Sequence, residues 1–291
     1  MAFKDHFSGH AAAYADARPS YPEELFTFLT AQCEHHDLAW DCATGNGQAA
    51  ASLAKFFKRV IATDGSAQQV QQAQPADNIE YRQMTAETKA LEEGSCDLIT
   101  VAQALHWFDR DAFFANVKAC LKPQGALAVW CYGVHTINAP VDAVFGKLYE
   151  EILGEYWPPE RRLVENHYQD LEFPFNSVTE HAFVMIRDWN LQQLCGYFTS
   201  WSATVASTFN VPLFLGGDGL SPSLPGGFVF ILPWWGLMSS DFSITMQLNL
   251  SNSSPPNRLR MSTNKLGSKG RLVENSFIPQ KYWMYRFSEI I

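Results

Sequence analysis

The stretch WDCATGNGQAAASLAKFF, residues 40–57, decides the fold, because it joins a short apolar strand to a helix through a turn with two glycines. Small residues at alternate positions of this turn, Ala43, Gly45 and Gly47, allow the backbone to approach a ligand closely. The segment after the turn is rich in helix formers. A strand, a glycine turn and a helix in this order predict a parallel sheet with a ligand at the carboxyl end of its first strand.

Strands and helices alternate on either side of this turn. Short apolar strands separated by helices predict an α/β fold, a Rossmann-like, doubly wound, mostly parallel sheet with helices on both faces. Five strands are predicted, at residues 37–42, 59–64, 78–84, 96–103 and 126–132. The loops that follow these strands meet at one edge of such a sheet, and we expect the ligand there.

Two acids end the first two strands, Asp41 and Asp64, and Asp64 lies 19 residues after Gly45. Asp41 offers a carboxylate to a cationic amine, and Asp64 can accept both hydroxyls of an adenosine ribose. A nicotinamide dinucleotide requires the spacing G-x-G-x-x-G, and Asp41 would repel its diphosphate. S-adenosylmethionine has no phosphate and carries a sulfonium and an ammonium. The pattern therefore favours methyl transfer over hydride transfer.

Several motifs in order resemble class I S-adenosylmethionine-dependent methyltransferases, over about residues 3–204. The resemblance is to the branch that includes the trans-aconitate methyltransferases. It rests on the following segments: FSGHAAAYADARPSYP (7–22), DCATGNGQ (41–48), ATD (62–64), TAE (85–87), CDLITVAQALHWF (96–108) and LKPQG (121–125).

The resemblance implies a cofactor site made of residues from five segments. The implied residues are Tyr14 and Arg18 closing over the cofactor, Ala43, Thr44, Gly45 and Gly47 along its methionine part, Asp64 on the ribose, Thr85, Ala86 and Glu87 around the adenine, and Gln103, Ala104 and His106 beside the transferred methyl group. His106 is the first candidate for a catalytic base if the acceptor is an amine, thiol or phenol. A packing role in an aromatic cluster is the alternative for His106. A carboxylate acceptor needs no base, and the reaction needs no metal.

Composition narrows the range of partners. The formal charge is −9, which disfavours nucleic acid. The longest apolar run, residues 228–235, is far shorter than a membrane span. Six scattered cysteines and an N-terminus without an apolar signal segment favour the cytoplasm over an exported, disulfide-bonded protein. We expect a small-molecule methyl acceptor, with a carboxylic acid as the candidate class, and no nucleic-acid or membrane partner; the oligomeric state stays open.

The composition changes near residue 206. Residues 207–291 carry thirteen serines, and seven Lys/Arg against four Asp/Glu. We therefore predict a methyltransferase domain over residues 1–206 and an atypical tail of uncertain order over 207–291. The resemblance implies about seven strands, with residues 183–189 as the sixth. The tail would then supply the last strand, for which 211–215 and 228–232 are the candidates, while 242–250 reads as a half-buried strand.

If the tail does not supply the last strand, the sheet lacks a strand between the fifth and the sixth. Backbone and apolar surface would then be exposed. This is the basis of an alternative hypothesis, that the chain is a non-catalytic or destabilised variant that binds the cofactor weakly or binds a partner protein. A dehydrogenase or another nucleotide enzyme is the third interpretation.

Overall fold

The computed structural model describes residues 20–89, 91–187, 189, 191–210 and 276–286, all of which belong to one compact unit. The helices of eight or more residues are α2 (Glu23–Thr30), α5 (Arg110–Cys120), α6 (Ala139–Gly146), α8 (Leu191–Thr199) and α9 (Ser202–Asn210). The shorter ones are α3 (Gln48–Leu53), α4 (Ala67–Gln72), α7 (Arg161–Glu165), the 3-10 turns η2 (Leu105–Trp107) and η4 (Gly154–Tyr156), and the π-helix η3 (Lys147–Ile152). None of the described helices is long and apolar enough to span a membrane.

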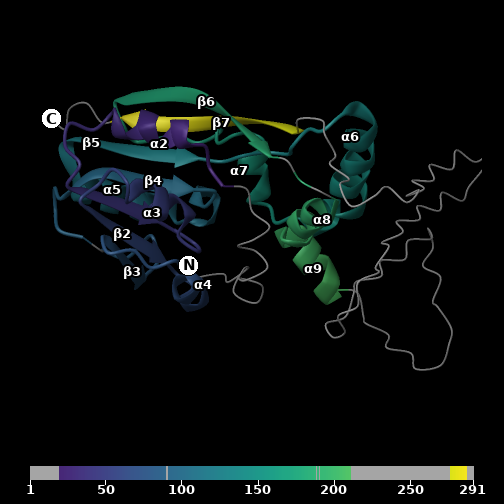
Figure 1. Ribbon diagram of the computed structural model, residues 1–291, viewed down its shortest axis with the longest axis horizontal. Coiled ribbons are helices and arrows are strands. Elements are labelled where there is room, and N and C mark those ends of the chain that lie inside the picture. Colours follow the sequence, from purple (N-terminus) through teal and green to yellow (C-terminus); the bar gives the residue numbers. More distant parts are fainter. Residues whose placement is uncertain (1–19, 90, 188, 190, 211–275, 287–291) are drawn as a thin grey trace, which may run out of the picture. The chain divides into compact units, whose positions relative to one another are not determined.

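Five parallel strands form the main part of the sheet, in the order β3-β2-β1-β4-β5 (Figure 1). They are β1 (Leu38–Cys42), β2 (Arg59–Asp64), β3 (Ile79–Gln83), β4 (Cys96–Ala102) and β5 (Leu121–Trp130). This arrangement confirms the predicted Rossmann-like parallel sheet. The chain winds outward in one direction from β1 to β3 and in the other from β4 to β5. The switch point, where ligands bind in such sheets, therefore lies between β1 and β4.

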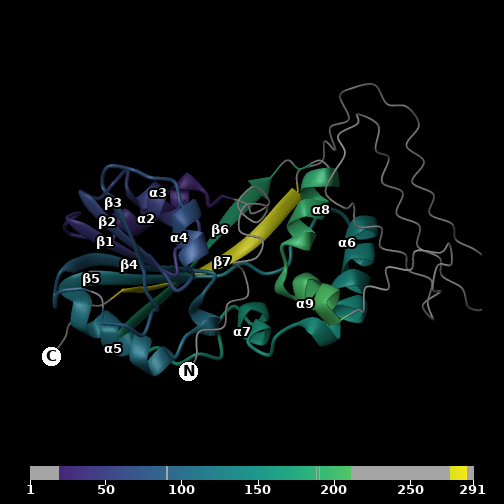
Figure 2. The same cartoon turned by 90° about the horizontal axis from the view of Figure 1, so that it is seen from below.

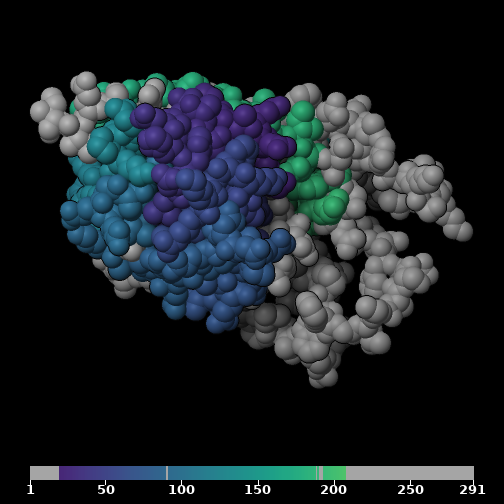
Figure 3. Space-filling model, turned by 60° about the vertical axis from the view of Figure 1, so that its left-hand side comes forward, coloured from purple at the N-terminus to yellow at the C-terminus, as the bar shows by residue number. Residues whose placement is uncertain are grey.

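Side chains alternate between the two faces of the sheet, as the period of a strand requires. On one face, Ala39 and Leu98 pack against α2 and α3. On the other face, Trp40 and Ile99 pack against Phe113 of α5. Helices therefore cover both faces, as predicted (Figure 2). The purple-to-blue residues, which belong to the α2–β3 part of the chain, cover one continuous face in Figure 3.

The strand β5 begins at Leu121, five residues before the predicted strand, and runs through residues 122–125. The pairing of β4 with β5 shifts register between Cys96 and Leu98, and residues 122–125 of the LKPQG sequence lie at this irregularity. Gly125 is needed there, since a Cβ atom at that position would lie 2.9 Å from the backbone oxygen of Cys96.

Two antiparallel strands extend the sheet beyond β5, in the order β5-β7-β6. The strand β6 (Ser177–Arg187) starts six residues before the predicted sixth strand, and β7 (Ser276–Arg286) comes from the tail. Pro279 of β7 pairs only with β6, because β5 pairs with Tyr282–Arg286 alone. A proline is tolerated where a strand has a partner on one side only.

The tail candidates for the last strand, 211–215, 228–232 and 242–250, lie outside the described residues. The helix α9 runs across residue 206. The division of the chain into a domain over 1–206 and a tail stays a prediction.

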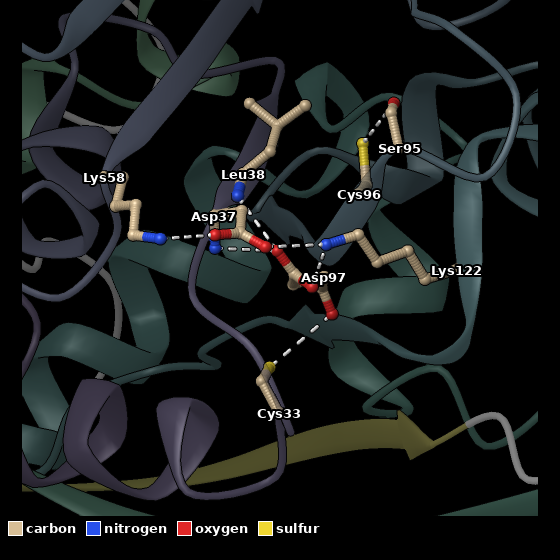
Figure 4. A network of polar contacts seen from close by, with 8 residues as sticks. All are labelled: Cys33, Asp37, Leu38, Lys58, Ser95, Cys96, Asp97 and Lys122. Atoms are coloured by element: carbon tan, nitrogen blue, oxygen red, sulfur yellow. Dashed lines mark hydrogen bonds and ion pairs between the residues drawn. The ribbon is translucent and has the colours of Figure 1, made fainter.

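A network of charges closes the opposite, amino-terminal edge of the sheet (Figure 4). The buried carboxylate of Asp97 accepts the backbone N–H groups of Asp37 and Leu38, each at 2.9 Å. The ammonium of Lys122 lies 2.7 Å from Asp97 and 3.1 Å from Asp37. Lys58 and Lys122 lower the pKa of the Asp37 carboxyl to about 2. The network ties together the starts of β1, β4 and β5, so it supports the fold and lies away from the switch point.

Candidate functional site

Backbone hydrogen bonds join the loops at the carboxyl edge of the sheet. The N–H of Thr44 donates to the carbonyl of Thr63 at 2.9 Å, and the N–H of Met84 donates to that of Asp64 at 2.8 Å. The N–H of Gln103 donates to the carbonyl of Trp130 at 2.9 Å. The loops after β1, β2, β3, β4 and β5 therefore meet at one edge, as the sequence predicts.

The turn after β1 adopts backbone conformations that favour glycine. The φ angles are 56° at Ala43, 58° at Gly45 and 88° at Gly47, all in the left-handed region. A Cβ atom on Gly47 would lie 2.4 Å from the hydroxyl of Tyr81 on β3, and one on Gly45 would meet only Gln69 Oε1, at 3.9 Å. Gly47 is therefore required by contact as well as by conformation.

We expect Gly47→Ala to be more destabilising than Gly94→Ala. Both glycines have positive φ, but nothing lies within 4 Å of a Cβ on Gly94. The two variants share a conformational cost of about 1 kcal/mol, and only Gly47→Ala must also displace the Tyr81 hydroxyl. Urea unfolding measures the difference. Equal losses of stability would show that Tyr81 moves aside without cost.

Asp64 ends β2 and faces the glycine turn. Its Oδ2 accepts the N–H of Gly45 at 2.9 Å, and its Oδ1 accepts the N–H of Ser66 at 2.8 Å. The side chain is partly exposed. Each carboxylate oxygen has two lone pairs, so a carboxylate can accept several donors at once, including the two hydroxyls of a vicinal diol.

Asp41 differs from the prediction, because its carboxylate is fully buried, with 0% exposure. The hydroxyl of Thr44 donates to Oδ2, and that of Thr100 on β4 donates to Oδ1 at 2.7 Å. The expected direct contact with a cationic amine is therefore not the arrangement in this structure. In the sequence, an acid at the end of a strand is compatible both with contact to a ligand and with internal support of the fold. The burial of the Asp41 side chain indicates internal support. Asp41 supports the glycine turn through its hydrogen bond with Thr44, and it joins β1 to β4 at the switch point through its hydrogen bond with Thr100.

Burial raises the pKa of Asp41 to about 6, and the nearby charge of Asp64 acts in the same direction. Because the unfolded chain has the ordinary pKa of 3.8, the native state holds this proton more tightly. Stability therefore falls as the pH rises from about 4 to about 6, and the cost remains at higher pH. The difference in pKa corresponds to about 3 kcal/mol.

We expect Asp41→Asn to increase the free energy of unfolding at pH 8 and to flatten its dependence between pH 4 and 6. The amide keeps hydrogen-bond partners for Thr44 and Thr100 without a buried charge. Asp41→Ala is the control, because it leaves both hydroxyls without an acceptor and should destabilise the protein. Urea unfolding at several pH values measures the free energy of unfolding of both variants. An Asn variant as unstable as the Ala variant at pH 8 contradicts the expectation.

Gln69 on α4 is a site residue that the sequence analysis missed. Its side chain is buried, and its Oε1 has no hydrogen-bond partner among the described residues. The same atom lies nearest to Gly45 in the turn. Gln69 follows β2 in a run of similar glutamines, so only the fold distinguishes it from its neighbours.

The three residues predicted to border an adenine lie after β3. Ala86 is buried and its carbonyl accepts Asn116 Nδ2 at 3.0 Å. Glu87 Oε1 accepts the N–H of Asp109 at 3.0 Å, and the Thr85 hydroxyl is 3.1 Å from that of Thr88. The Glu87 contact closes this loop onto the start of α5. The three residues follow β3 at the same edge of the sheet as Asp64.

The residues predicted beside the transferred methyl group follow β4. Gln103 has a φ of 57°, and its Nε2 donates to the carbonyl of Tyr132 at 3.1 Å. Ala104 is buried, and His106 lies on η2 with 7% exposure. His106 Nδ1 lies 2.9 Å from the hydroxyl of Tyr168, which sequence analysis did not single out. Burial, and secondarily the charge of Arg161, lowers the pKa of His106 to about 3, which disfavours the proton uptake that a base requires.

An aromatic cluster is formed by residues that follow β5 in the sequence. The cluster contains Tyr132, Phe145, Tyr149, Tyr197 and Trp201 as buried members. His135 lies against Phe145, with ring centroids 4.3 Å apart, and neither of its ring nitrogens has a partner among the described residues.

Arg161 places a cation at this cluster. Its guanidinium carbon lies 4.9 Å from the ring centroid of Trp157 and 5.6 Å from that of Tyr149. Its Nε donates to the Tyr149 hydroxyl at 2.8 Å. Its neighbour Arg162 is exposed.

Two predicted residues, Tyr14 and Arg18, lie outside the described residues. Within the described part of the chain, no group of three or more His, Cys, Asp or Glu side chains could hold a metal ion.

The site suits S-adenosylmethionine better than a dinucleotide. The N–H of Gly45, which a diphosphate would need, already donates to the Asp64 carboxylate. A buried carboxylate, Asp41, lies directly below the turn. The unpartnered Gln69 Oε1 and the partly exposed Asp64 can accept hydrogen bonds from ammonium or hydroxyl groups. These groups fit a phosphate-free cationic nucleoside.

Comparisons with known proteins agree with this chemistry. Residues 40–129 match the family described as methyltransferase domain. The chain is 39% identical to a protein of Dictyostelium discoideum assigned as a methyltransferase. The 208 aligned residues cover 70% of this chain and 79% of that protein. An uncharacterised methyltransferase of Mycobacterium tuberculosis is 31% identical over 209 residues, or 70% of this chain and 80% of that one.

A solved structure from Anaeromyxobacter dehalogenans, assigned as a type II methyltransferase, is similar as well. It superposes with a TM-score of 0.62 and 36% identity over 67% of this chain and 83% of that one. The chain belongs to the class I S-adenosylmethionine-dependent methyltransferases.

Proposed function

We propose that this methyltransferase binds S-adenosylmethionine at the carboxyl ends of β1, β2 and β4 and methylates a small organic acceptor. The observation that carries the proposal is the carboxylate of Asp64, which faces the glycine turn at 2.9 Å from the Gly45 nitrogen. We assign the ribose hydroxyls to Asp64, and the methionine part to Ala43, Thr44, Gly45 and Gly47. Asp41 supports the turn from below.

The remaining assignments follow the edge of the sheet. Thr85, Ala86 and Glu87 border the adenine, and Gln103, Ala104 and His106 lie beside the transferred methyl group. Tyr14 and Arg18 close over the cofactor from the N-terminal segment.

The cofactor, when bound, supplies a methyl group already activated on a sulfonium. The residues of this chain therefore have to align the acceptor and exclude water. The aromatic cluster after β5 supplies an apolar wall for a small organic molecule.

We propose a carboxylic acid as the acceptor class. An ionised carboxylate can accept the methyl group without a base. An amine or a phenol would need a base to remove its proton. His106 is a weak base in this environment, with its pKa near 3 and its Nδ1 engaged by Tyr168. The motifs shared with the trans-aconitate branch favour the same class, and we place the chain in that branch.

Other features of the working protein belong to the same proposal. The buried cysteines carry no disulfide among the described residues, which favours the cytoplasm. The net charge of −9 disfavours nucleic acid as a partner. The antiparallel pair β7 and β6 completes a seven-stranded sheet, so that the catalytic form includes a strand from the tail.

Transfer of a labelled methyl group tests the function. The full chain is incubated with S-adenosylmethionine labelled on its methyl group and with trans-aconitate, citrate, benzoate, tyramine or dithiothreitol. We expect label in the carboxylic acids and none in tyramine or dithiothreitol. Cofactor binding without transfer to any probe would favour the non-catalytic alternative, and labelled tyramine would contradict the acceptor class.

A further inference from the structure

The hydrogen bond between His106 and Tyr168 connects two distant parts of the chain at the proposed site. His106 lies on η2, directly after Gln103 and Ala104, and Tyr168 lies just beyond α7. The Nδ1 and hydroxyl atoms are 2.9 Å apart, and both side chains are buried. A buried pair of this kind fixes the orientation of the imidazole ring.

The backbone around Tyr168 is built to hold its ring in place. The N–H of Tyr168 donates to the carbonyl of Leu163 at 2.8 Å, and that of His167 donates to Val164 at 3.0 Å. These two bonds form the Schellman motif that ends α7. The motif favours glycine at the first position after the cap, yet His167 and Tyr168 have φ angles of 51° and 59°. Two successive side-chain-bearing residues in the left-handed region are uncommon, and such conformations persist where the surrounding structure holds them in place.

The protons of the pair can be placed from the contacts. Burial raises the pKa of Tyr168 well above its usual value and lowers that of His106, so both groups are neutral at physiological pH. Among the described residues, the Tyr168 hydroxyl has one hydrogen-bond partner, His106 Nδ1. A phenol hydroxyl is a stronger acid than the N–H of a neutral imidazole, and a bare imidazole nitrogen is the better acceptor, so the Tyr168 proton is directed to His106 Nδ1. A neutral imidazole that accepts at Nδ1 carries its proton on Nε2.

The free end of the imidazole is thus a donor. No partner for Nε2 exists among the described residues. The charged group that acts on the ring is Arg161, whose positive charge disfavours the imidazolium. A negative charge on Cys131 would raise the pKa of Tyr168, but Cys131 stays a neutral thiol because burial raises its own pKa to about 12.

We propose that Tyr168 is a positioning residue that holds His106 as the Nε2–H tautomer, so that His106 donates a hydrogen bond to the methyl acceptor and does not act as its base. This inference rests on the proposed function for the identity of the acceptor site, and it changes the role expected for His106. A donor at this position orients an acceptor oxygen through one lone pair and leaves another lone pair for the methyl group.

The tautomer can be observed without any activity. In the full chain labelled with ¹⁵N-histidine, His106→Gln identifies the His106 signals by their loss. We expect wild-type Nδ1 to resonate as a pyridine-type nitrogen and Nε2 as a pyrrole-type nitrogen, with no titration of either between pH 5 and 8. A pyrrole-type Nδ1 would overturn the proposal. Because no cofactor is added, failure here is distinct from failure to bind S-adenosylmethionine.

Substitutions of His106 and Tyr168 test their roles in methyl transfer to trans-aconitate or benzoate. His106→Gln keeps an amide donor but cannot act as a base, so we expect it to retain at least tenfold more kcat than His106→Ala. Tyr168→Phe should lower kcat about tenfold with unchanged affinity for S-adenosylhomocysteine. Tyr285→Phe is the matched control and should keep wild-type kcat, because Tyr285 of β7 pairs with Leu127 within β5 and is not part of the loops that form the proposed site. Equal inactivity of the Gln and Ala variants, with circular dichroism showing both folded, would contradict a donor role.

Discussion

Asp64→Ala should abolish measurable binding of S-adenosylmethionine while the protein stays folded. The carboxylate is the group we assign to the two ribose hydroxyls, and hydrogen bonds to a charged group contribute about 1.5–3 kcal/mol each. Loss of two such bonds lowers affinity by a factor of about 100 or more. The variant also leaves the N–H groups of Gly45 and Ser66 without their acceptor, which loosens the turn. Isothermal titration calorimetry with S-adenosylhomocysteine measures the loss.

Asp77→Ala is the matched control for this prediction. It removes the same charge from an exposed position just before β3. We expect Asp77→Ala to bind with wild-type affinity, and Asp41→Asn to lose less affinity than Asp64→Ala, since the Asp41 carboxylate is buried. Wild-type affinity in Asp64→Ala would remove the ribose assignment and with it the centre of the proposed site.

Met284→Pro should cost about 3 kcal/mol or more of stability. Met284 pairs with Ala128 of β5 on one side and with Thr179 of β6 on the other. A proline there removes the backbone donor and places its ring in a strand with two partners. The edges of β5 and β6 would then be exposed, which promotes aggregation.

Met284→Thr is the control, because threonine is a good strand former and keeps the backbone donor. Urea unfolding of the full chain separates the two variants. A Met284→Pro protein as stable as the Met284→Thr protein would show that residues 276–286 do not complete the sheet, and would favour the destabilised variant among the earlier hypotheses.

Much of the parallel sheet could be predicted from local sequence. The strand β2 begins and ends where predicted, because RVIATD is an apolar run bounded by charged residues, and its last residue Asp64 lies at the expected edge. The cap of α4 was also predictable, since Ser66 Oγ accepts the N–H of Gln69 at 3.3 Å. These features depend on residues within a few positions of one another.

The features that could not be predicted depend on contacts between distant residues. Asp41 and Thr100 are 59 residues apart in sequence, and their hydrogen bond turns an expected ligand contact into internal support. His106 and Tyr168 are 62 residues apart, and nothing local marks Tyr168 as the partner. The segment of β7 contains Pro279, which speaks against a strand until the one-sided pairing is known.

The central claim is that the edge above β1 and β2 binds a phosphate-free adenosyl compound. The most direct measurement is a pair of calorimetric titrations of the full chain, one with S-adenosylhomocysteine and one with NAD⁺. We predict one equivalent of S-adenosylhomocysteine bound per chain and no heat of binding with NAD⁺. Binding of NAD⁺ in the absence of any response to S-adenosylhomocysteine would contradict the account.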